Sequence, residues 1–339
     1  MKKIYLAITM IALSAILFAC GTQTNETDDT QRVEVSVTHT ITTGALESET
    51  GTSFDTTGAT SQEVTETFLT NPTRVAIFSY DALDILDVIG LDLTSIQMLG
   101  VVKSNLPSFL SSYDSNEYEN VGTLFMPDWD TLDLFNPELI IVGARSTGAY
   151  DTLKENYPHA DILDVSLTYG AYSEGLTRNV DNLGKIFPDI EVALDTKLAT
   201  LVEDMEAINT VAMTHEALFI LVNGESLSFY GPNGRFAVLH DEFGFIPADA
   251  QAEEGGSHGS VVGYEYVAAV DPEILFLMDR GAAVGGESTL ESVINNSLIS
   301  GTQAGENDKI YILNGEAWYI ASGGFTSTQQ MIDDLSDFS

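Results

Sequence analysis

One phrase occurs twice in this chain at a constant interval, and it constrains the fold more than any other feature. The first copy, FMPDWDTLDLFNPELIIVGAR, spans residues 125–145, and the second, SHGSVVGYEYVAAVDPEILFLMDR, spans residues 257–280. Each reads as a short helix, an Asn-Pro or Asp-Pro turn and a buried strand that is followed by an arginine. Aligned on the turns, the matched positions are separated by 135 residues, which pairs Arg145 with Arg280. A register shared over this length predicts two lobes built alike.

The two arginines stand where ligands are bound in α/β proteins. Ligands of open parallel sheets lie beyond the carboxyl ends of the strands, so we expect Arg145 and Arg280 to face a cleft between the lobes. A third arginine, Arg235, follows the turn Gly-Pro-Asn-Gly at residues 231–234, and we expect it to open a helix beside donors that favour an anion. Each arginine taken alone is more readily interpreted as a solvated surface residue. Three together would form a positive site for a multiply anionic ligand.

The remaining pattern is typical of α/β architecture. In the first half, β-rich runs at 74–78 and 139–142 alternate with helical spacing at 80–90 and 172–187. This alternation predicts parallel sheets that are covered by helices. The second half repeats the style, with the strand-like runs ALFILV, SLSFYG, ILFLM and IYIL and a final helix from about Thr326.

The segment between the halves differs from both. Residues 189–215 contain no glycine or proline, and their apolar side chains recur at helical spacing. A helix of about 25 residues would be about 37 Å long, which exceeds a typical globular helix. We therefore predict a rigid helix over 189–213 that joins the two lobes.

The N-terminus reads as an export signal with an attachment point. Two lysines precede an apolar run over residues 4–18, and the only cysteine, Cys20, follows at the cleavage position. We expect a lipoprotein signal peptide over 1–20 and acylation of Cys20, which would anchor the chain stably. No cysteine remains for disulfides or thiolate metal sites.

Composition and motifs exclude several classes of function. The net charge of −38, from 13 basic and 51 acidic residues, argues against nucleic acid or an anionic membrane surface as a direct partner. The sequence contains no HExxH or Walker motif, and we expect no enzymatic activity. A surface lipoprotein with adhesive or structural duties stays open as an alternative, although it gives the paired arginines no role.

Several segments resemble one family of binding proteins. They are NPTRVAIFSYDALDIL, LPSFL, VGTLFMPDWDTL, NPELIIVGARS, FYGPNGRF, LHDEFGFIPAD, SHGSVVGYEYVAAVDPEILFLMDRG and AWYIASGGFTSTQQMI, and they cover the chain from about residue 71 to its end. They are similar to siderophore-binding lipoproteins of iron ABC importers, in the catecholate (enterobactin- or petrobactin-like) group. The general two-lobe pattern is shared with haem and cobalamin binders of the same fold, which stay open as alternatives.

The resemblance implies a fold and a binding site. The fold class is α/β, with two Rossmann-like lobes bridged by a single long helix, as in class III periplasmic binding proteins. The implied ligand is a ferric catecholate held by Arg145, Arg235 and Arg280, with no intrinsic cofactor. His258 and Tyr319 are implied to complete the ferric coordination of tetradentate chelates, which suits a hard cation. We expect the neighbouring aromatic Trp318 to contact the ligand.

The resemblance also implies partners and a location. Asp130 and Glu265 match the acidic residues, one on each lobe, that dock such proteins onto the two permease subunits of an ABC transporter. We expect a monomer on the extracytoplasmic face of the cell membrane, attached through its lipid alone, and more typical of a Gram-positive surface than of a periplasm. The expected divisions are a signal peptide at 1–20, a tether at 21–32, a first lobe at 33–188 with a Ser/Thr-rich loop or disordered insertion at 42–62, a bridging helix at 189–213 and a second lobe at 214–339.

Overall fold

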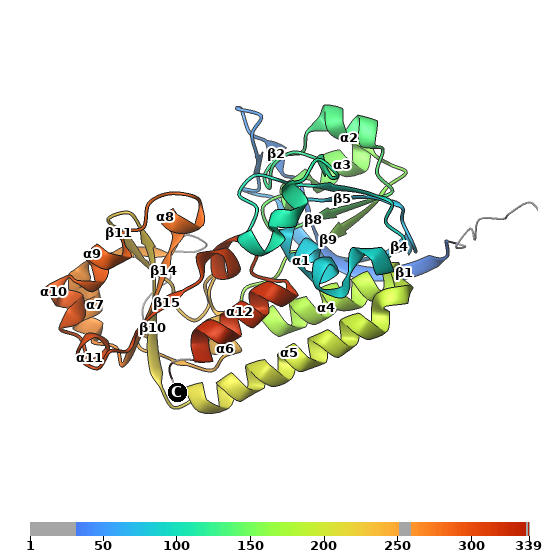
Figure 1. Ribbon diagram of the computed structural model, residues 1–339. Helices are drawn as coiled ribbons and strands as arrows, with labels where there is room; N and C mark the ends of the chain where they lie inside the picture. The colour runs from blue at the N-terminus through green and yellow to red at the C-terminus, as the bar shows by residue number, and fades with distance from the viewer. Residues whose placement is uncertain (1–31, 251–258, 337, 339) are drawn as a thin grey trace, which may run out of the picture. The chain divides into compact units, whose positions relative to one another are not determined.

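The computed structural model describes residues 32–250, 259–336 and 338. These residues form two β-sheets flanked by helices, a long helix that follows the first sheet and precedes the second, and a β-hairpin near the start (Figure 1). The predicted α/β class with two lobes is therefore confirmed. The expected signal peptide, the tether except for Arg32, and Cys20 lie outside the described residues.

The sheet of the first lobe has five parallel strands in the order β7-β6-β5-β8-β9. All four side chains of β8 are buried, as are three of the four in β5, which explains why these runs are apolar throughout. The strands are β5 (Arg74–Ile77), β6 (Met98–Val101), β7 (Glu119–Asn120), β8 (Leu139–Val142) and β9 (Asp161–Asp164). The helices are α1 (Tyr80–Ile89), α2 (Trp129–Phe135), α3 (Tyr150–Asn156) and α4 (Tyr172–Ile186), with short 3-10 turns η1 (Leu91–Leu93), η2 (Ser108–Asp114), η3 (Thr147–Ala149) and η4 (Pro188–Ile190).

The sheet of the second lobe is mixed, which the sequence did not indicate. Strand β10 is parallel to β12 and β14, and β14 is parallel to β15, but β11 runs antiparallel to both of its neighbours, β10 and β13. The reversal follows from a two-residue turn, because Asn223 pairs directly with Ser226. The strands are β10 (Glu216–Asn223), β11 (Ser226–Phe229), β12 (Ile246–Pro247), β13 (Ser260–Val262), β14 (Ile274–Asp279) and β15 (Ile310–Leu313). The helices are α6 (Val238–Asp241), α7 (Tyr264–Val270), α8 (Arg280–Ala283), α9 (Leu290–Ile294), α10 (Ser297–Ser300), α11 (Gln303–Glu306), a π-helix η6 (Glu316–Ile320) and α12 (Phe325–Ser336).

The predicted long helix is present as α5 (Glu191–Ala212), which has 22 residues and is about 33 Å long. Leu194, Leu201 and Met205 are buried on one side, where α5 packs against α4 and α12. Val192 is 78% exposed and lies off this stripe, although it matched the expected spacing. Among the described residues, no helix is both long and apolar enough to cross a membrane.

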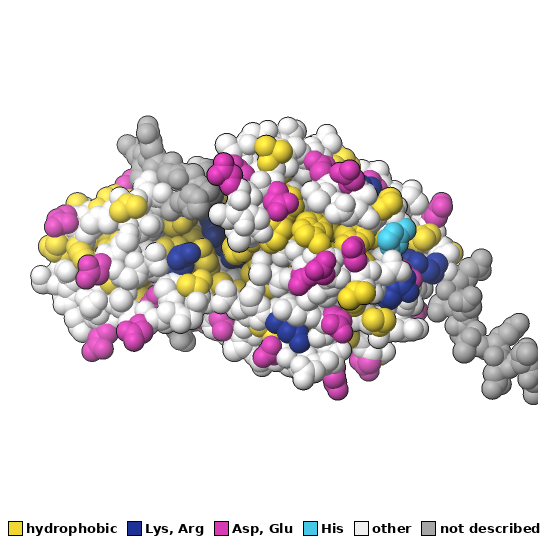
Figure 2. Space-filling model, turned by 90° about the horizontal axis from the view of Figure 1, so that it is seen from above, with side chains coloured by type: hydrophobic (Ala, Val, Ile, Leu, Met, Phe, Trp, Pro, Cys, Tyr) yellow, Lys and Arg dark blue, Asp and Glu magenta, His cyan; other side chains and the backbone are white. Residues whose placement is uncertain are grey.

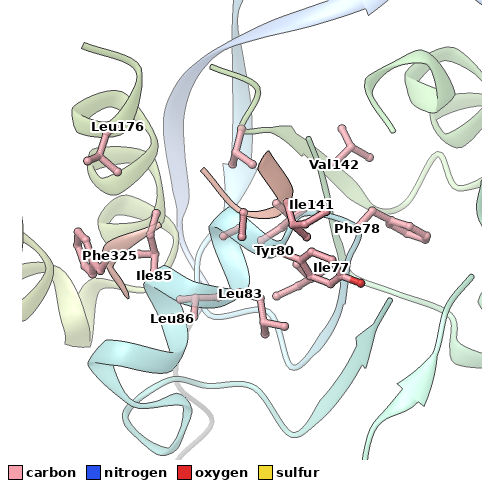
Figure 3. Close-up of a cluster of buried hydrophobic side chains, with 14 of the residues drawn as sticks. Ile77, Phe78, Tyr80, Leu83, Ile85, Leu86, Ile141, Val142, Leu176 and Phe325 are labelled. Atoms are coloured by element: carbon pink, nitrogen blue, oxygen red, sulfur yellow. The ribbon is translucent and has the colours of Figure 1, made fainter. Parts of the chain in front are cut away.

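The C-terminal helix α12 connects the end of the chain to the first lobe. It packs against α1 and α5, and Phe325 lies beside Ile85 of α1 in the buried cluster that Figure 3 shows. Two carboxylates of α1 accept hydrogen bonds from the main chain just before and within the first turn of α12. Asp81 accepts from the Gly323 N–H at 3.1 Å, and the fully buried Asp84 accepts from the N–H groups of Thr326 and Ser327, both at 2.9 Å.

The Ser/Thr-rich stretch at 42–62 forms the outer end of a β-hairpin, where short strands alternate with turns, so the expectation of a loop or disorder was only partly right. Strand β1 (Glu34–Thr43) pairs antiparallel with β4 (Thr60–Leu69), and a smaller pair, β2 (Leu46–Glu47) and β3 (Phe54–Asp55), lies between them. Threonine suits a strand because it is β-branched, and hydroxyls pair across the ladder, as in Thr38–Thr65 at 2.9 Å. Strand pairing of this kind does not need a large apolar surface. The shortage of apolar residues in this stretch therefore led to the expectation of disorder, although the strands can still pair.

Candidate functional site

The repeated phrase forms the same local structure in both lobes. Helices α2 and α7 each end at a residue in the left-handed region, Asn136 with φ 50° and Asp271 with φ 51°. Each of these caps donates its N–H to a carbonyl of the last helical turn, and a proline follows. The next strands, β8 and β14, both lie beside the first strand of their sheet, β5 or β10. The internal repeat predicted from spacing is therefore a repeat in structure.

The paired arginines lie just beyond the carboxyl ends of these strands. Arg145 follows β8 by three residues, and Arg280 follows β14 directly as the first residue of α8. Arg235 lies in the turns before α6, which begins only at Val238, so the expectation that Arg235 opens a helix was wrong. Gly234 and Ala237 form turns here instead. All three arginines are partly buried.

The three guanidinium groups converge on one tyrosine, Tyr319. Arg280 donates from Nε to the Tyr319 hydroxyl at 2.9 Å. Arg145 and Arg235 donate to the Tyr319 carbonyl at 2.6 Å and 2.8 Å, and Arg145 also donates to the Ile320 carbonyl at 3.1 Å. The guanidinium carbons lie 4.1–5.5 Å from the centroid of the Tyr319 ring, within cation–π range. The predicted convergence of arginines from both halves of the chain is thus present in the geometry.

Within the described part of the chain, these guanidinium groups form no ion pair with a carboxylate. Among the ion pairs formed within residues 32–250 and 259–336, none involves Arg145, Arg235 or Arg280. By contrast, Arg32 and Arg74 both pair with Glu138. Although the chain has 51 acidic residues, the described acceptors of these three arginines are uncharged carbonyl, hydroxyl and amide oxygens. Their positive charge is therefore not neutralised by these contacts and can attract an external anion.

The cluster changes the acidity of its own members. Burial on its own would raise the pKa of Tyr319, but the hydrogen bond from Arg280 and the charges of all three arginines outweigh it and lower that pKa below its usual value. Burial, together with the neighbouring charge of Arg235, lowers the pKa of Arg145. A lowered pKa makes the loss of the phenol proton easier.

A cavity of about 200 Å³ lies beside the cluster, and both lobes contribute to its lining. Arg145 and Arg235 line it together with Tyr80, Asp81 and Tyr169. Figure 2 shows basic side chains in a hollow of this face among hydrophobic ones, with acidic side chains spread over the surrounding surface. A positive hollow within an acidic exterior favours an anion in the hollow over binding elsewhere.

Asp81 is the acidic member of the cavity wall. Burial raises its pKa to about 6, against the opposing effects of the Gly323 N–H and the charge of Arg145. Sequence reasoning missed Asp81 and Tyr169. Asp81 follows strand β5 just as Arg145 follows β8, and this position at a strand end is the signal that could have found it.

Trp318 does not join this site. It is 1% exposed, packs against Phe219 and Phe243, and donates from Nε1 to Asp334 at 2.9 Å. Consecutive residues of a helix point in different directions, so Trp318 enters the core while Tyr319 faces the arginines. Trp318 is therefore a packing residue in this structure, against the expectation of ligand contact.

The other predicted residues fall in three places. Asp130 and Glu265 are exposed, and each is the second residue of its helix, α2 or α7, so they occupy equivalent positions. Their role in docking stays a prediction. His258 and Cys20 lie outside the described residues. Within the described residues, no group of three or more His, Cys, Asp or Glu side chains could hold a metal ion.

The structure has two similar α/β lobes, a long connecting helix, and a cationic cluster whose arginines come from both lobes. These features are those of a two-lobed solute-binding protein. Comparison with known families agrees. Residues 75–317 match the model of the periplasmic binding protein family, and the chain belongs to that family. Membership confirms the expectation of a binding protein rather than an enzyme.

Individual relatives extend over nearly the whole chain. The petrobactin-binding protein YclQ of Bacillus subtilis (strain 168) is 30% identical, with 99% of each chain covered. The ferric-anguibactin-binding protein FatB of Vibrio anguillarum is 28% identical over 80% of this chain and 84% of its own. The crystal structure of the catecholate-siderophore binding protein VctP from Vibrio cholerae superposes with a TM-score of 0.74 at 29% identity, covering 88% of this chain and 100% of that one.

Proposed function

We propose that this protein is the substrate-binding lipoprotein of an ABC importer and that it captures a ferric catecholate siderophore. The observation that carries the proposal is the set of three guanidinium groups, from both halves of the chain, that surround Tyr319 and form no ion pair with any described carboxylate. A ferric bis-catecholate or tris-catecholate is anionic and rich in oxygen acceptors, which suits charge-assisted hydrogen bonds. The relatives named as petrobactin-, ferric-anguibactin- and catecholate-siderophore-binding proteins support an iron chelate as the ligand.

Tyr319 has a further role in this proposal. A bis-catecholate supplies four oxygens to ferric iron and leaves two coordination positions open. A phenolate is a suitable hard ligand, and the lowered pKa of Tyr319 favours that form. We propose His258 as the second protein ligand. In this scheme the arginines orient the chelate, and Tyr319 exchanges its hydrogen bond from Arg280 for the metal.

Attachment and delivery complete the proposal. Acylation of Cys20 would hold the protein on the extracytoplasmic face of the membrane, with a Gram-positive surface favoured. The loaded protein would then dock on the permease through Asp130 and Glu265, which are exposed and equivalent in the two lobes. A separate ATPase would drive transport, so binding involves no chemical step.

The test is a titration of the wild-type protein against a panel of chelates, followed by intrinsic fluorescence. The panel contains the ferric complexes of a linear bis-catecholamide and a hexadentate tris-catecholamide, together with haem and cobalamin. We expect submicromolar dissociation constants, stronger than about −8 kcal/mol, for at least one ferric catecholate. Tighter binding of haem or cobalamin than of either catecholate would overturn the proposal.

A spectroscopic measurement tests the role of Tyr319 separately. Mixing wild-type protein with the ferric bis-catecholamide should change the visible charge-transfer band and give a circular dichroism signal of defined sign. Tyr319→Phe removes the phenol oxygen, so we expect a shifted band with this variant. An identical spectrum for Tyr319→Phe would rule out coordination by Tyr319 while leaving the binding function intact.

A further inference from the structure

The hairpin of β1 to β4 lies against the segment that directly follows Arg145, although nothing in the proposed function gives the hairpin a role. Strand β1 contacts α3 and η3, and β3 contacts η3 as well. Turn η3 begins at Thr147, two residues after Arg145. The hairpin is therefore a neighbour of the binding site, and three separate sets of contacts join the two.

The first set is close packing of the hairpin tip on Gly148. A Cβ placed on Gly148 would lie 2.7 Å from Cβ of Phe54 and 3.3 Å from Cβ of Ala45. No larger residue fits there without displacing the tip. The Gly44 N–H also donates to the Asp151 carboxylate at 2.7 Å, so the tip holds both η3 and the start of α3.

The second set is a buried polar chain that starts at His39 of β1. His39 is fully buried, and its Nδ1 accepts a hydrogen bond from the Asp164 N–H at 3.0 Å. The Asp164 carboxylate accepts a hydrogen bond from the Thr147 hydroxyl. Because Nδ1 is an acceptor, the ring is neutral with its proton on Nε2, which lies 3.3 Å from a carboxylate oxygen of Glu66. Burial lowers the pKa of His39, in agreement with this neutral form.

The third set joins β4 to α3. Glu66 accepts a hydrogen bond from the Tyr150 hydroxyl at 2.8 Å and pairs with Lys154 at 3.1 Å. The hairpin therefore contacts the segment from Thr147 to Lys154 in three ways. Its Gly44 N–H bonds to Asp151, and its Glu66 accepts a hydrogen bond from the Tyr150 hydroxyl and forms an ion pair with Lys154. Arg145 precedes this segment by two residues, in the loop between β8 and η3.

We propose that the hairpin is a positioning element for Arg145: it fixes the loop after β8 so that the Arg145 guanidinium is preorganised toward the ligand cleft. The inference rests on the proposed function. Arginine has a flexible side chain, and a mobile backbone would add to the freedom lost on binding. Holding the loop in advance reduces that loss and so strengthens binding of the anionic chelate. His39, Phe54 and Glu66 then act through Arg145 and do not touch the ligand.

The test is a double-mutant cycle with the ferric bis-catecholamide as the probe. Thr43 pairs directly with Thr60, so an Asn-Gly turn can replace residues 44–59 and close β1 and β4 as a two-residue hairpin. We expect this shortened variant to bind about tenfold more weakly than wild type, a coupling of ordinary size for residues in contact. In an Arg145→Ala background the same shortening should change the dissociation constant by less than about twofold. In an Arg235→Ala background the tenfold effect should persist, because the hairpin does not hold Arg235.

Point variants keep the test decisive if the shortened chain does not fold. Phe54→Ala removes the phenyl ring that packs the tip against the buried core, and it should show the same dependence on Arg145. Leu46→Ala is the matched control, since Leu46 lies in the same tip but is 74% exposed, and it should leave affinity unchanged. Unchanged affinity for Phe54→Ala and the shortened chain, or the same loss in every background, overturns the inference. Absence of binding by the wild-type protein would instead overturn the proposed function itself.

Discussion

The buried carboxylate of Asp84 gives the sharpest prediction about stability. Asp84 is 0% exposed, and it accepts hydrogen bonds from the N–H groups of Thr326 and Ser327 at 2.9 Å and from the Ser327 hydroxyl at 3.1 Å. These donors lie in the first turn of α12, where an anion also interacts favourably with the helix dipole. Asp84 therefore joins the first lobe to the C-terminal helix.

The magnitude follows from the donors that Asp84→Ala would leave without an acceptor. A buried main-chain N–H without a partner costs about 1–3 kcal/mol, and two main-chain donors are affected here, the buried Ser327 N–H and the partly buried Thr326 N–H. We therefore expect Asp84→Ala to lower the free energy of unfolding by about 2–6 kcal/mol. Asp84→Asn keeps one acceptor oxygen but turns its amide toward the other donors, so its cost should be about 1–2 kcal/mol.

Urea unfolding followed by circular dichroism measures both variants. The ligand should stabilise each folded variant, because the arginine cluster does not include Asp84. A loss below about 1 kcal/mol for Asp84→Ala would show that water replaces the carboxylate and would refute the reasoning.

The remaining predictions concern the site and its surroundings. Asp81 has a pKa raised to about 6, so it is mostly ionised at neutral pH and opposes an anionic ligand, whereas below about pH 6 it becomes neutral. We expect wild-type affinity for a ferric catecholate, relative to that of Asp81→Asn, to rise several-fold between about pH 7.5 and pH 5.5, and a constant ratio would contradict this. Trp318→Phe should lower the free energy of unfolding by about 1–3 kcal/mol and leave the dissociation constant of the ferric catecholate within about twofold of wild type. A large loss of affinity would show that Trp318 contacts the ligand after all. Asp130→Lys combined with Glu265→Lys should retain ligand binding in titrations but reduce iron uptake by cells, and undiminished uptake would exclude these residues from docking.

Much of the fold could be predicted because its signals are local in the sequence. The Asn-Pro and Asp-Pro turns, the buried strands β8 and β14 and the arginines after them recur in one register, and the structure repeats them. The long helix was indicated by apolar spacing without glycine or proline. Because both arginines follow equivalent strands, their approach to a common point could be inferred before any coordinates.

The features that were predicted wrongly share a physical cause. Each of them depends on contacts between segments that are distant in the sequence. Composition cannot show that Thr43 pairs with Thr60, so a hairpin was taken for a loop. Spacing cannot show which of two adjacent aromatic residues faces the arginines, and Trp318 was assigned to the site with Tyr319. The cavity position of Asp81 likewise depends on how α1 meets the second lobe.

Isothermal titration calorimetry with the ferric bis-catecholamide tests the arginine cluster most directly. It would compare wild-type protein with the triple variant Arg145→Ala, Arg235→Ala and Arg280→Ala. Loss of three charge-assisted contacts of about 1.5–3 kcal/mol each predicts weakening by at least a thousandfold, with the fold retained by circular dichroism. A triple variant that binds within about tenfold of wild type would contradict the account.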